Sequence, residues 1–222
     1  MTTASTSTLG FTHRFVRGTA GTAGTTLLLL HGTGGDENDL LPLGEALLSG
    51  ASMLSPRGKV LEHGMPRFFR RLAEGVFDVE DLKARTRELA TFVRDATVAY
   101  SLDPARTIAV GFSNGANIAA SLHLLEPDVL AGSILIRAMV PLEPDVPPRL
   151  AGVPILLSSG TADPMVPRAN SERLARLLER FGAAVTTHWE PGGHALGEGD
   201  VRAAREWLEE RGLGPGAKGL GE

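Results

Sequence analysis

The feature that most constrains the fold is an alternation of short apolar runs with longer segments of helical periodicity. Continuous apolar runs of strand length occupy residues 26–30, 106–112, 131–138 and 153–160. Such runs are typical of strands buried on both faces, as in parallel sheets. Helix-period segments lie between or after them, at residues 39–48, 79–100, 113–125, 169–180 and 201–211. The pattern predicts an α/β structure with a mostly parallel central sheet and helices on both faces.

Weaker patterns complete this sheet and set the domain boundaries. Residues 11–18 alternate loosely and predict an edge strand, and residues 51–56 and 183–190 predict two more strands. We expect a single domain over residues 11–212, because 222 residues suit one large domain. The Ser/Thr-rich residues 1–10 and the Gly-rich residues 213–222 are expected to be flexible ends.

Composition excludes several classes of function. The net charge of −4 offers no basic field for nucleic acid or anionic lipid. The absence of cysteine excludes a thiol nucleophile and thiolate metal ligands. The first residues lack the basic and apolar regions of a secretory signal, and the apolar run near residue 28 is too short to span a bilayer. We therefore expect a cytoplasmic protein without stable membrane anchoring.

One serine lies in a setting that predicts nucleophilic catalysis. Gly111-Phe112-Ser113-Asn114-Gly115 fits the pattern G-x-S-x-G, directly after a predicted strand and before a predicted helix. This pattern is typical of a sharp strand-to-helix turn that exposes the serine hydroxyl. Because glycine and serine are common in turns, the motif needs a base and a carboxylate elsewhere in the chain.

Both groups follow later strands, at the sheet edge where sites form in α/β proteins. Asp163 comes after the strand at residues 153–160, and His194 comes after the strand at residues 183–190, behind two glycines. Asp163 could instead be a plain turn residue before proline, and His194 a solvated loop histidine. The chain order Ser113, Asp163, His194 favours a triad of nucleophile, orienting carboxylate and general base.

The glycine-rich turn at residues 31–36 predicts an oxyanion hole. Glycines let the backbone approach another group closely, and hydrolases of this type take one donor from an early loop and one from the residue after the nucleophile. We assign the backbone N–H groups of Thr33 and Asn114, with a plain glycine turn as the alternative. His31, placed before this turn, is expected to be structural. This chemistry requires no metal and no organic cofactor.

With these residues identified, the chain resembles the α/β-hydrolases of the phospholipase/carboxylesterase family. The resemblance runs from "LLLLHGTGGDENDLLPL" through "GFSNGANIA" and "GTADPMVP" to "GGHALG". Residues 55–82 and "ILIRAMVPLEP" are similar to a bacterial subgroup related to the methylhydroquinone-resistance hydrolase. The resemblance implies an α/β-hydrolase fold with no large separate cap domain. It also implies Ser113, Asp163 and His194 as the triad, and Thr33 and Asn114 as oxyanion donors.

Residues 57–77 form the least generic stretch, too long for a tight crossover. One interpretation is a cover over the substrate pocket, with Met65, Phe68 and Phe69 supplying apolar wall and Arg137 and Met139 joining from the neighbouring strand end. The alternative is a structural loop in which both phenylalanines fill a small core and the arginines are solvated.

The resemblance implies a carboxylesterase that acts on a small or short-chain ester. Relatives cleave lysophospholipids or acyl-thioesters, which gives a second hypothesis, although related acyl-protein thioesterases usually have Gln at the position of Asn114. A non-catalytic ligand receptor on the same fold is a third. The expected partner is a small ester, and a homodimer is a further expectation for a chain of this size.

Overall fold

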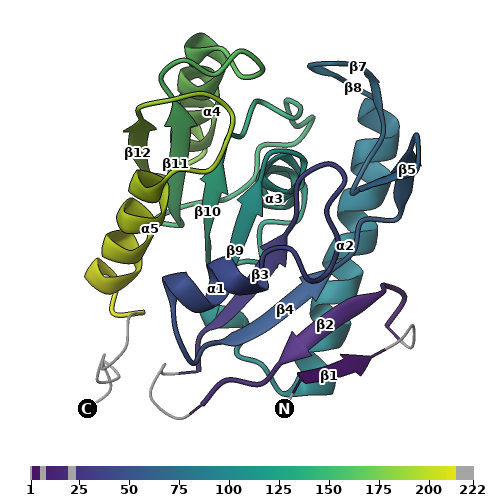
Figure 1. Ribbon diagram of the computed structural model, residues 1–222. Coiled ribbons are helices and arrows are strands. Elements are labelled where there is room, and N and C mark those ends of the chain that lie inside the picture. Colours follow the sequence, from purple (N-terminus) through teal and green to yellow (C-terminus); the bar gives the residue numbers. More distant parts are fainter. Residues whose placement is uncertain (1, 6–8, 20–23, 214–222) are drawn as a thin grey trace.

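The computed structural model describes residues 2–5, 9–19 and 24–213, and its centre is one twisted sheet (Figure 1). Eight strands follow the order β1-β2-β4-β3-β9-β10-β11-β12 in the described part of the chain. From β4 to β12 all neighbours are parallel, whereas β2 is antiparallel to both β1 and β4. The predicted mostly parallel sheet is therefore confirmed. The bounds are β1 (Thr2–Ser5), β2 (His13–Val16), β3 (Thr26–Leu30), β4 (Ser52–Pro56), β9 (Thr107–Phe112), β10 (Gly132–Ile136), β11 (Pro154–Gly160) and β12 (Ala184–Glu190).

Helices cover both faces of this sheet, as the alternation predicts. The helices are α1 (Leu41–Leu47), α2 (Val79–Tyr100), α3 (Asn114–Leu125), α4 (Arg168–Arg180) and α5 (Glu198–Glu210), with a short 3-10 turn η1 (Pro104–Arg106). Leu28 and Leu30 of β3 share a core with α2, α3 and α4, while Leu27 and Leu29 share one with α1 and α5. Successive strand side chains point to opposite faces, so a strand between two cores must be apolar throughout.

The long helix α2 shows how the sequence sets an element's limits. The Asp78 carboxylate accepts a hydrogen bond from the Asp81 N–H at 3.1 Å, which satisfies one free donor of the first turn. Leu82, Leu89 and Phe92 lie on one side and are fully buried against the sheet. The helix ends at Tyr100, and the capping residue Ser101 adopts a left-handed conformation with φ of 54°.

The N-terminal region differs from expectation. The strand predicted at residues 11–18 is β2, but it is not the sheet edge, because Thr2–Ser5 pair with it as β1. Residues 2–5 thus belong to the sheet, since the open side of β2 offers unpaired backbone groups. Of the other predicted flexible residues, Leu9 and Leu213 pack against the two cores, and residues 1, 6–8 and 214–222 lie outside the described residues. Helix α1 is shorter than the predicted residues 39–48.

Residues 57–77 contain two small hairpins, which the sequence analysis treats as a loop. β5 (Val60–Glu62) pairs with β6 (Met65–Arg67), and β7 (Arg71–Ala73) pairs with β8 (Val76–Phe77). The β7–β8 hairpin lies at the end of the molecule toward which β10 and β11 point (Figure 1). This segment therefore reaches the sheet edge at which the predicted site residues lie.

Candidate active site

Ser113 is the single residue between β9 and α3, and its backbone is strained. Its φ is 51° and its ψ is −112°, a conformation that residues with a side chain rarely adopt. The Ser113 N–H donates to the Ile136 carbonyl oxygen at 2.8 Å, which ties the turn to the end of β10. The chain thus reverses sharply at the serine, as G-x-S-x-G predicts.

The two motif glycines permit this turn because no side chain fits at either position. A Cβ on Gly111 would lie 2.6 Å from the Gly115 carbonyl oxygen, on the far side of the turn. A Cβ on Gly115 would lie 1.9 Å from the Leu30 carbonyl oxygen, at the end of β3. Both neighbours are backbone atoms that cannot rotate away. The glycines therefore let α3 begin directly against the sheet.

The structure brings His194 and Asp163 to Ser113 in one hydrogen-bonded chain. His194 Nε2 is 2.9 Å from Ser113 Oγ, and His194 Nδ1 is 2.8 Å from Asp163 Oδ2. Because an ionised carboxylate only accepts, the Nδ1 proton points at Asp163 and Nε2 can accept the serine proton. The Asp163 side chain is fully buried, and its other oxygen accepts the N–H groups of Met165 and Val166 at 2.8 and 3.0 Å.

Thr33 and Asn114 offer backbone donors beside this chain. Asn114 is the first residue of α3, and Thr33 lies in the glycine-rich turn after β3. Both residues line the same cleft as Ser113 and His194. Within the described part of the chain, neither N–H donates to an acceptor. Two unpaired N–H groups near a nucleophile can stabilise a negatively charged oxygen.

Residues 66–68 form hydrogen bonds with both segments that carry the proposed oxyanion donors, a role that the sequence analysis misses. Arg67 Nη1 donates to Thr33 Oγ1 at 2.6 Å, and the Phe68 N–H donates to the Asn114 side-chain oxygen at 2.8 Å. The Gly34 N–H donates to the Pro66 carbonyl oxygen at 2.9 Å. These partners lie more than thirty residues apart, and no periodic signal in the sequence links them. The segment thus acts on the site through its backbone and Arg67.

His31 connects the same segment to the sheet. Its Nε2 accepts the Gly58 N–H at 2.9 Å, so the Nδ1 proton points at the Gly32 carbonyl oxygen, 2.6 Å away. Burial lowers the pKa of this imidazole below its ordinary value. A buried neutral ring with both nitrogens paired has a structural role, as the sequence analysis expects.

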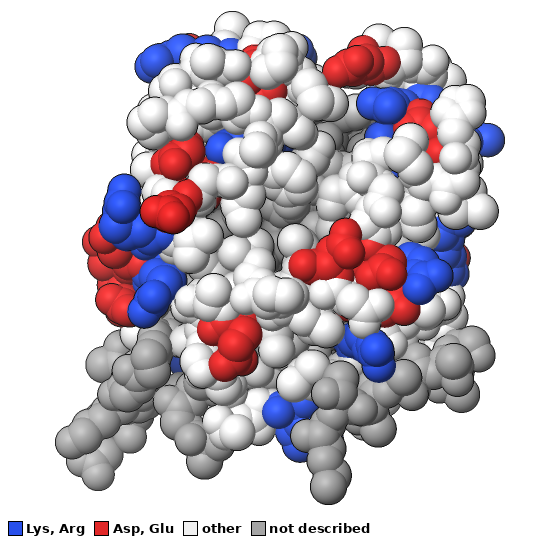
Figure 2. Space-filling view, viewed as in Figure 1, with Lys and Arg blue, Asp and Glu red and all other residues white. Residues whose placement is uncertain are grey.

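The cleft above Ser113 has both apolar and charged walls. Met139, Phe77, Met165 and Val166 supply its apolar side chains, while Arg67, Arg71 and Glu74 also line it. Its empty volume is about 410 Å³ when the space open to solvent is included. On the face shown in Figure 2, acidic and basic side chains are interspersed around the hollowed surface.

Three of the predicted pocket residues are corrected by the structure. Phe68 and Phe69 are 2% and 0% exposed and belong to the core, where Phe68 packs on His31 and Phe69 on Phe77. Met65 is 41% exposed and contacts the Gly34 turn rather than the cleft. Both rings are apolar and pack in the core, which favours the alternative that residues 57–77 form a structural loop. Met139 lines the cleft as predicted, and Phe77, which the sequence analysis does not name, lines it as well.

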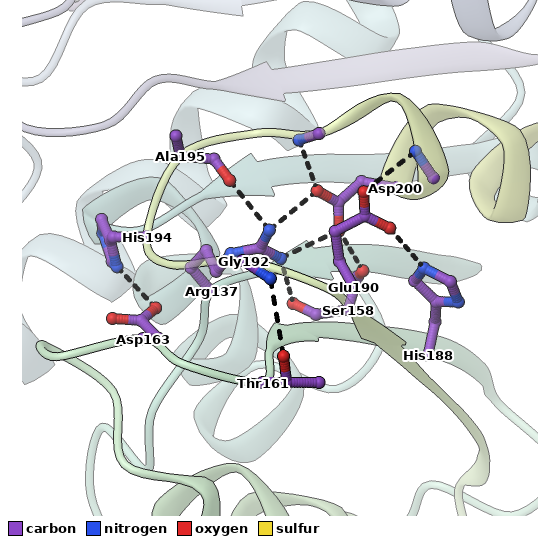
Figure 3. Close-up of polar contacts among 12 residues, drawn as sticks. Arg137, Ser158, Thr161, Asp163, His188, Glu190, Gly192, His194, Ala195 and Asp200 are labelled. Carbon is purple, nitrogen blue, oxygen red and sulfur yellow. Dashed lines mark hydrogen bonds and ion pairs between the residues drawn. The ribbon is translucent and has the colours of Figure 1, made fainter.

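Arg137 borders the cleft but points its guanidinium into the protein. Its side chain is fully buried and forms an ion pair with the equally buried Asp200 at 2.8 Å (Figure 3). Burial alone raises the pKa of the Asp200 carboxyl, but hydrogen bonds from Arg137, Ser158 and the Gly197 N–H outweigh it and lower that pKa. Arg137 thus lines the cleft as predicted, while its guanidinium is a buried ion-pair partner.

A possible metal-binding group lies behind this ion pair. His188, Glu190 and Asp200 place ligand atoms within 4.8 Å of one another. Both Asp200 oxygens, however, already accept hydrogen bonds from Arg137, so a cation would face a fixed positive charge. These residues do not fit a metal centre.

In the described residues, every helix is too short or too polar to cross a membrane.

The sheet order and the serine between strand and helix define an α/β-hydrolase, and the described residues form no separate cap domain. A model of the phospholipase/carboxylesterase family matches residues 12–211, and the chain belongs to this family. The family resemblance predicted from the sequence is thus confirmed.

Individual relatives agree with this assignment. The chain is 50% identical over 190 residues to the "Putative hydrolase MhqD" of Bacillus subtilis (strain 168), covering 86% of this chain and 95% of that protein. The crystal structure of the Bacillus cereus carboxylesterase matches with 49% identity and a TM-score of 0.85, over 90% and 94% of the two chains. Atu2452 of Agrobacterium tumefaciens str. C58 matches with 36% identity and a TM-score of 0.79, over 90% and 96%.

Proposed function

We propose that this protein is a serine esterase that cleaves small or short-chain carboxylic esters through an acyl-enzyme on Ser113. The observation that carries the proposal is the chain of contacts from Ser113 Oγ to His194 at 2.9 Å and from His194 to Asp163 at 2.8 Å. A serine hydroxyl is nearly inert at neutral pH until a base removes its proton during attack. The similarity to a carboxylesterase over nearly the whole chain supports the same reaction class.

In the first half of the reaction, Ser113 Oγ attacks the ester carbonyl while its proton moves to His194 Nε2. The Asp163 carboxylate stabilises the imidazolium and keeps Nδ1 protonated. The carbonyl oxygen becomes an oxyanion, which accepts hydrogen bonds from the N–H groups of Thr33 and Asn114. Each such donor contributes about 3–4 kcal/mol to lowering the barrier. The tetrahedral intermediate then collapses, and His194 gives its proton to the departing alkoxide.

In the second half, water repeats the attack on the acyl-enzyme. His194 takes a proton from the water, and hydroxide adds to the acyl carbonyl within the same donor pair. Collapse of this intermediate releases the carboxylic acid and returns the proton to Ser113 Oγ. Every proton transfer passes through His194, and the residues named supply all the groups that the cycle requires.

The cleft favours a small ester over a lysophospholipid. Its apolar side chains are few, and Arg67, Arg71 and Glu74 share its walls. A long acyl chain needs a continuous apolar groove, because burying methylene groups against charged side chains brings little free energy. Acyl-thioesters of small acids fit the same mechanism, whereas a non-catalytic receptor would not require the aligned proton path.

A panel of chromogenic esters with acyl chains of two to twelve carbons, together with a long-chain lysolipid and an acyl-thioester, tests this proposal. We expect kcat/KM to be highest for the shortest chains and to fall as the chain lengthens. Ser113→Ala should lower kcat by a factor of about 10⁶, since the nucleophile is absent. Ser49→Ala, which changes an exposed serine after α1, is the matched control and should retain full activity.

The outcomes separate the alternatives. Higher rates on long-chain lysolipids or on acyl-thioesters than on short esters would replace the proposed substrate class and leave the mechanism intact. Equal rates for wild type and Ser113→Ala would refute the mechanism. Folded wild-type protein that hydrolyses none of these substrates would support a ligand receptor instead.

A further inference from the structure

Arg137 is a fully buried cation with an acceptor for every donor. Its five N–H groups face the carbonyl oxygens of Gly193, Ala195 and Ser158 and both oxygens of Asp200. Four of the five donor–acceptor distances lie between 2.8 and 3.0 Å, and the bond to Ser158 is longer at 3.4 Å. A buried guanidinium is costly unless it is fully paired, so this arrangement is specific.

Two of these acceptors flank His194. Arg137 Nε donates to the Gly193 carbonyl oxygen at 3.0 Å. Its Nη2 donates to the Ala195 carbonyl oxygen at 2.8 Å (Figure 3). The planar guanidinium thus holds the backbone on both sides of the histidine. Glycines at 192 and 193 otherwise leave this loop free to adopt many conformations. Fixing both carbonyls restricts where the imidazole can lie.

The same residue also lies next to the anchor of the nucleophile. The carbonyl of Ile136, its immediate neighbour, accepts the Ser113 N–H at 2.8 Å. Arg137 itself adopts a left-handed conformation, with φ of 58°, and its N–H donates to the Ser158 carbonyl oxygen at 2.8 Å. Residues at the end of β10 therefore form hydrogen bonds with both the turn of Ser113 and the loop of His194.

Asp200 completes the arrangement from α5. Its oxygens accept both terminal nitrogens of Arg137, the Gly197 N–H at 2.7 Å and the Ser158 hydroxyl. The carboxylate therefore fixes the plane of the guanidinium and links it to β11, the strand that leads to Asp163. Ordinary stability does not require a buried ion pair, because apolar groups of similar volume serve equally well.

We propose that Arg137, oriented by Asp200, is a positioning residue that sets the distance between His194 and Ser113. This inference rests on the proposed function, because it assigns Arg137 an effect on catalysis through the general base. In the described residues, none of the five guanidinium hydrogen bonds of Arg137 goes to the side chains of Ser113, Asp163 or His194. A lysine in its place offers three donors on a flexible stem, so it keeps the charge beside Asp200 but cannot hold both carbonyls.

Arg137→Lys tests the proposal with the buried charge retained. We expect kcat on a short ester to fall 10- to 100-fold, since a displacement of about 1 Å in a catalytic group costs this much. KM should change by less than about threefold, because the cleft walls are untouched. Arg94→Lys, which alters a surface pair with Glu126, is the matched control and should match wild type.

A second measurement places the effect on His194. In a His194→Ala background, Arg137→Lys should leave the residual rate unchanged, because the group that it positions is already absent. If the two losses multiply instead, Arg137 acts on the structure at large and the proposal is overturned. Wild-type kcat in folded Arg137→Lys would also overturn it. Full activity of His194→Ala alone would refute the proposed function itself.

A further variant keeps the proposal testable if Arg137→Lys does not fold. Arg137→Met combined with Asp200→Asn removes both buried charges together, which avoids an uncompensated ion. The double variant lacks every donor to Gly193 and Ala195, so kcat should again fall at least 10-fold with little change in KM. Wild-type kcat in this folded variant would overturn the proposal.

Discussion

Gly115→Ala tests whether close packing of the nucleophile turn governs activity. The added Cβ would lie 1.9 Å from the Leu30 carbonyl oxygen, whereas Cβ atoms essentially never approach closer than 3.0 Å. The start of α3 must therefore move from the end of β3 by about 1.1 Å, and overpacking of this kind costs about 1–3 kcal/mol of folding stability. Ser113 and the Asn114 N–H lie on the segment that moves. A shift of about 1 Å at reacting groups corresponds to a rate loss on the order of 100-fold.

The assay combines urea denaturation with hydrolysis of a short chromogenic ester. We expect a lower free energy of unfolding and a kcat lowered by a factor of about 100 for the folded fraction. The matched control is Gly44→Ala in α1, where the new Cβ meets the flexible ends of Met53 and Leu29. The control should keep full activity. Wild-type kcat in folded Gly115→Ala would show that the turn tolerates displacement, and the packing argument would fail.

Three further predictions follow from individual side chains. Phe68→Ala should lower the free energy of unfolding by about 3–5 kcal/mol without altering acyl-length preference, because the ring is core; a changed preference would return Phe68 to the pocket. Met139→Ala, at the cleft wall, should raise relative rates on longer acyl chains, and an unaltered ester profile would contradict this. Burial lowers the pKa of His123 from 6.5 to about 4 in the folded state. As the pH decreases from about 6.5 to 4, the unfolded state binds a proton that the folded state does not, so the free energy of unfolding falls. The free energy of unfolding is measured by urea denaturation at pH 7 and at pH 4, and His123→Gln should remove about 3 kcal/mol of the loss between the two. Equal losses in the variant and the wild type would refute this prediction.

Much of the fold could be predicted because local patterns encode it directly. The run at residues 26–30 is apolar at every position since its two faces meet two cores. The N-cap pattern at Asp78 and Asp81 gives the start of α2. Ser113, Asp163 and His194 could be predicted as neighbours because each follows a strand, and parallel strands end at the same edge of a sheet. Their assignment as a catalytic triad remains a prediction, supported by the distances between them.

The features that the sequence analysis missed depend on long-range contacts. The hairpins in residues 57–77 are short and polar. They are fixed to the rest of the protein by contacts such as the hydrogen bond from Arg67 to Thr33, thirty-four residues away. Arg137 and Asp200 are 63 residues apart, so nothing near Arg137 indicated that its guanidinium would be buried. The sequence analysis places Arg137 at the pocket wall, but the pairing with Asp200 on α5 turns its guanidinium into the protein.

Covalent labelling with a fluorophosphonate, mapped by peptide mass spectrometry, tests the central claim most directly. The probe phosphonylates a serine only when a base activates the hydroxyl. We predict a single adduct on Ser113 of the folded wild type, abolished by Ser113→Ala and by prior unfolding, and at least 100-fold slower in His194→Ala. Folded wild-type protein that takes up no label, or takes it up on another residue, would contradict the account.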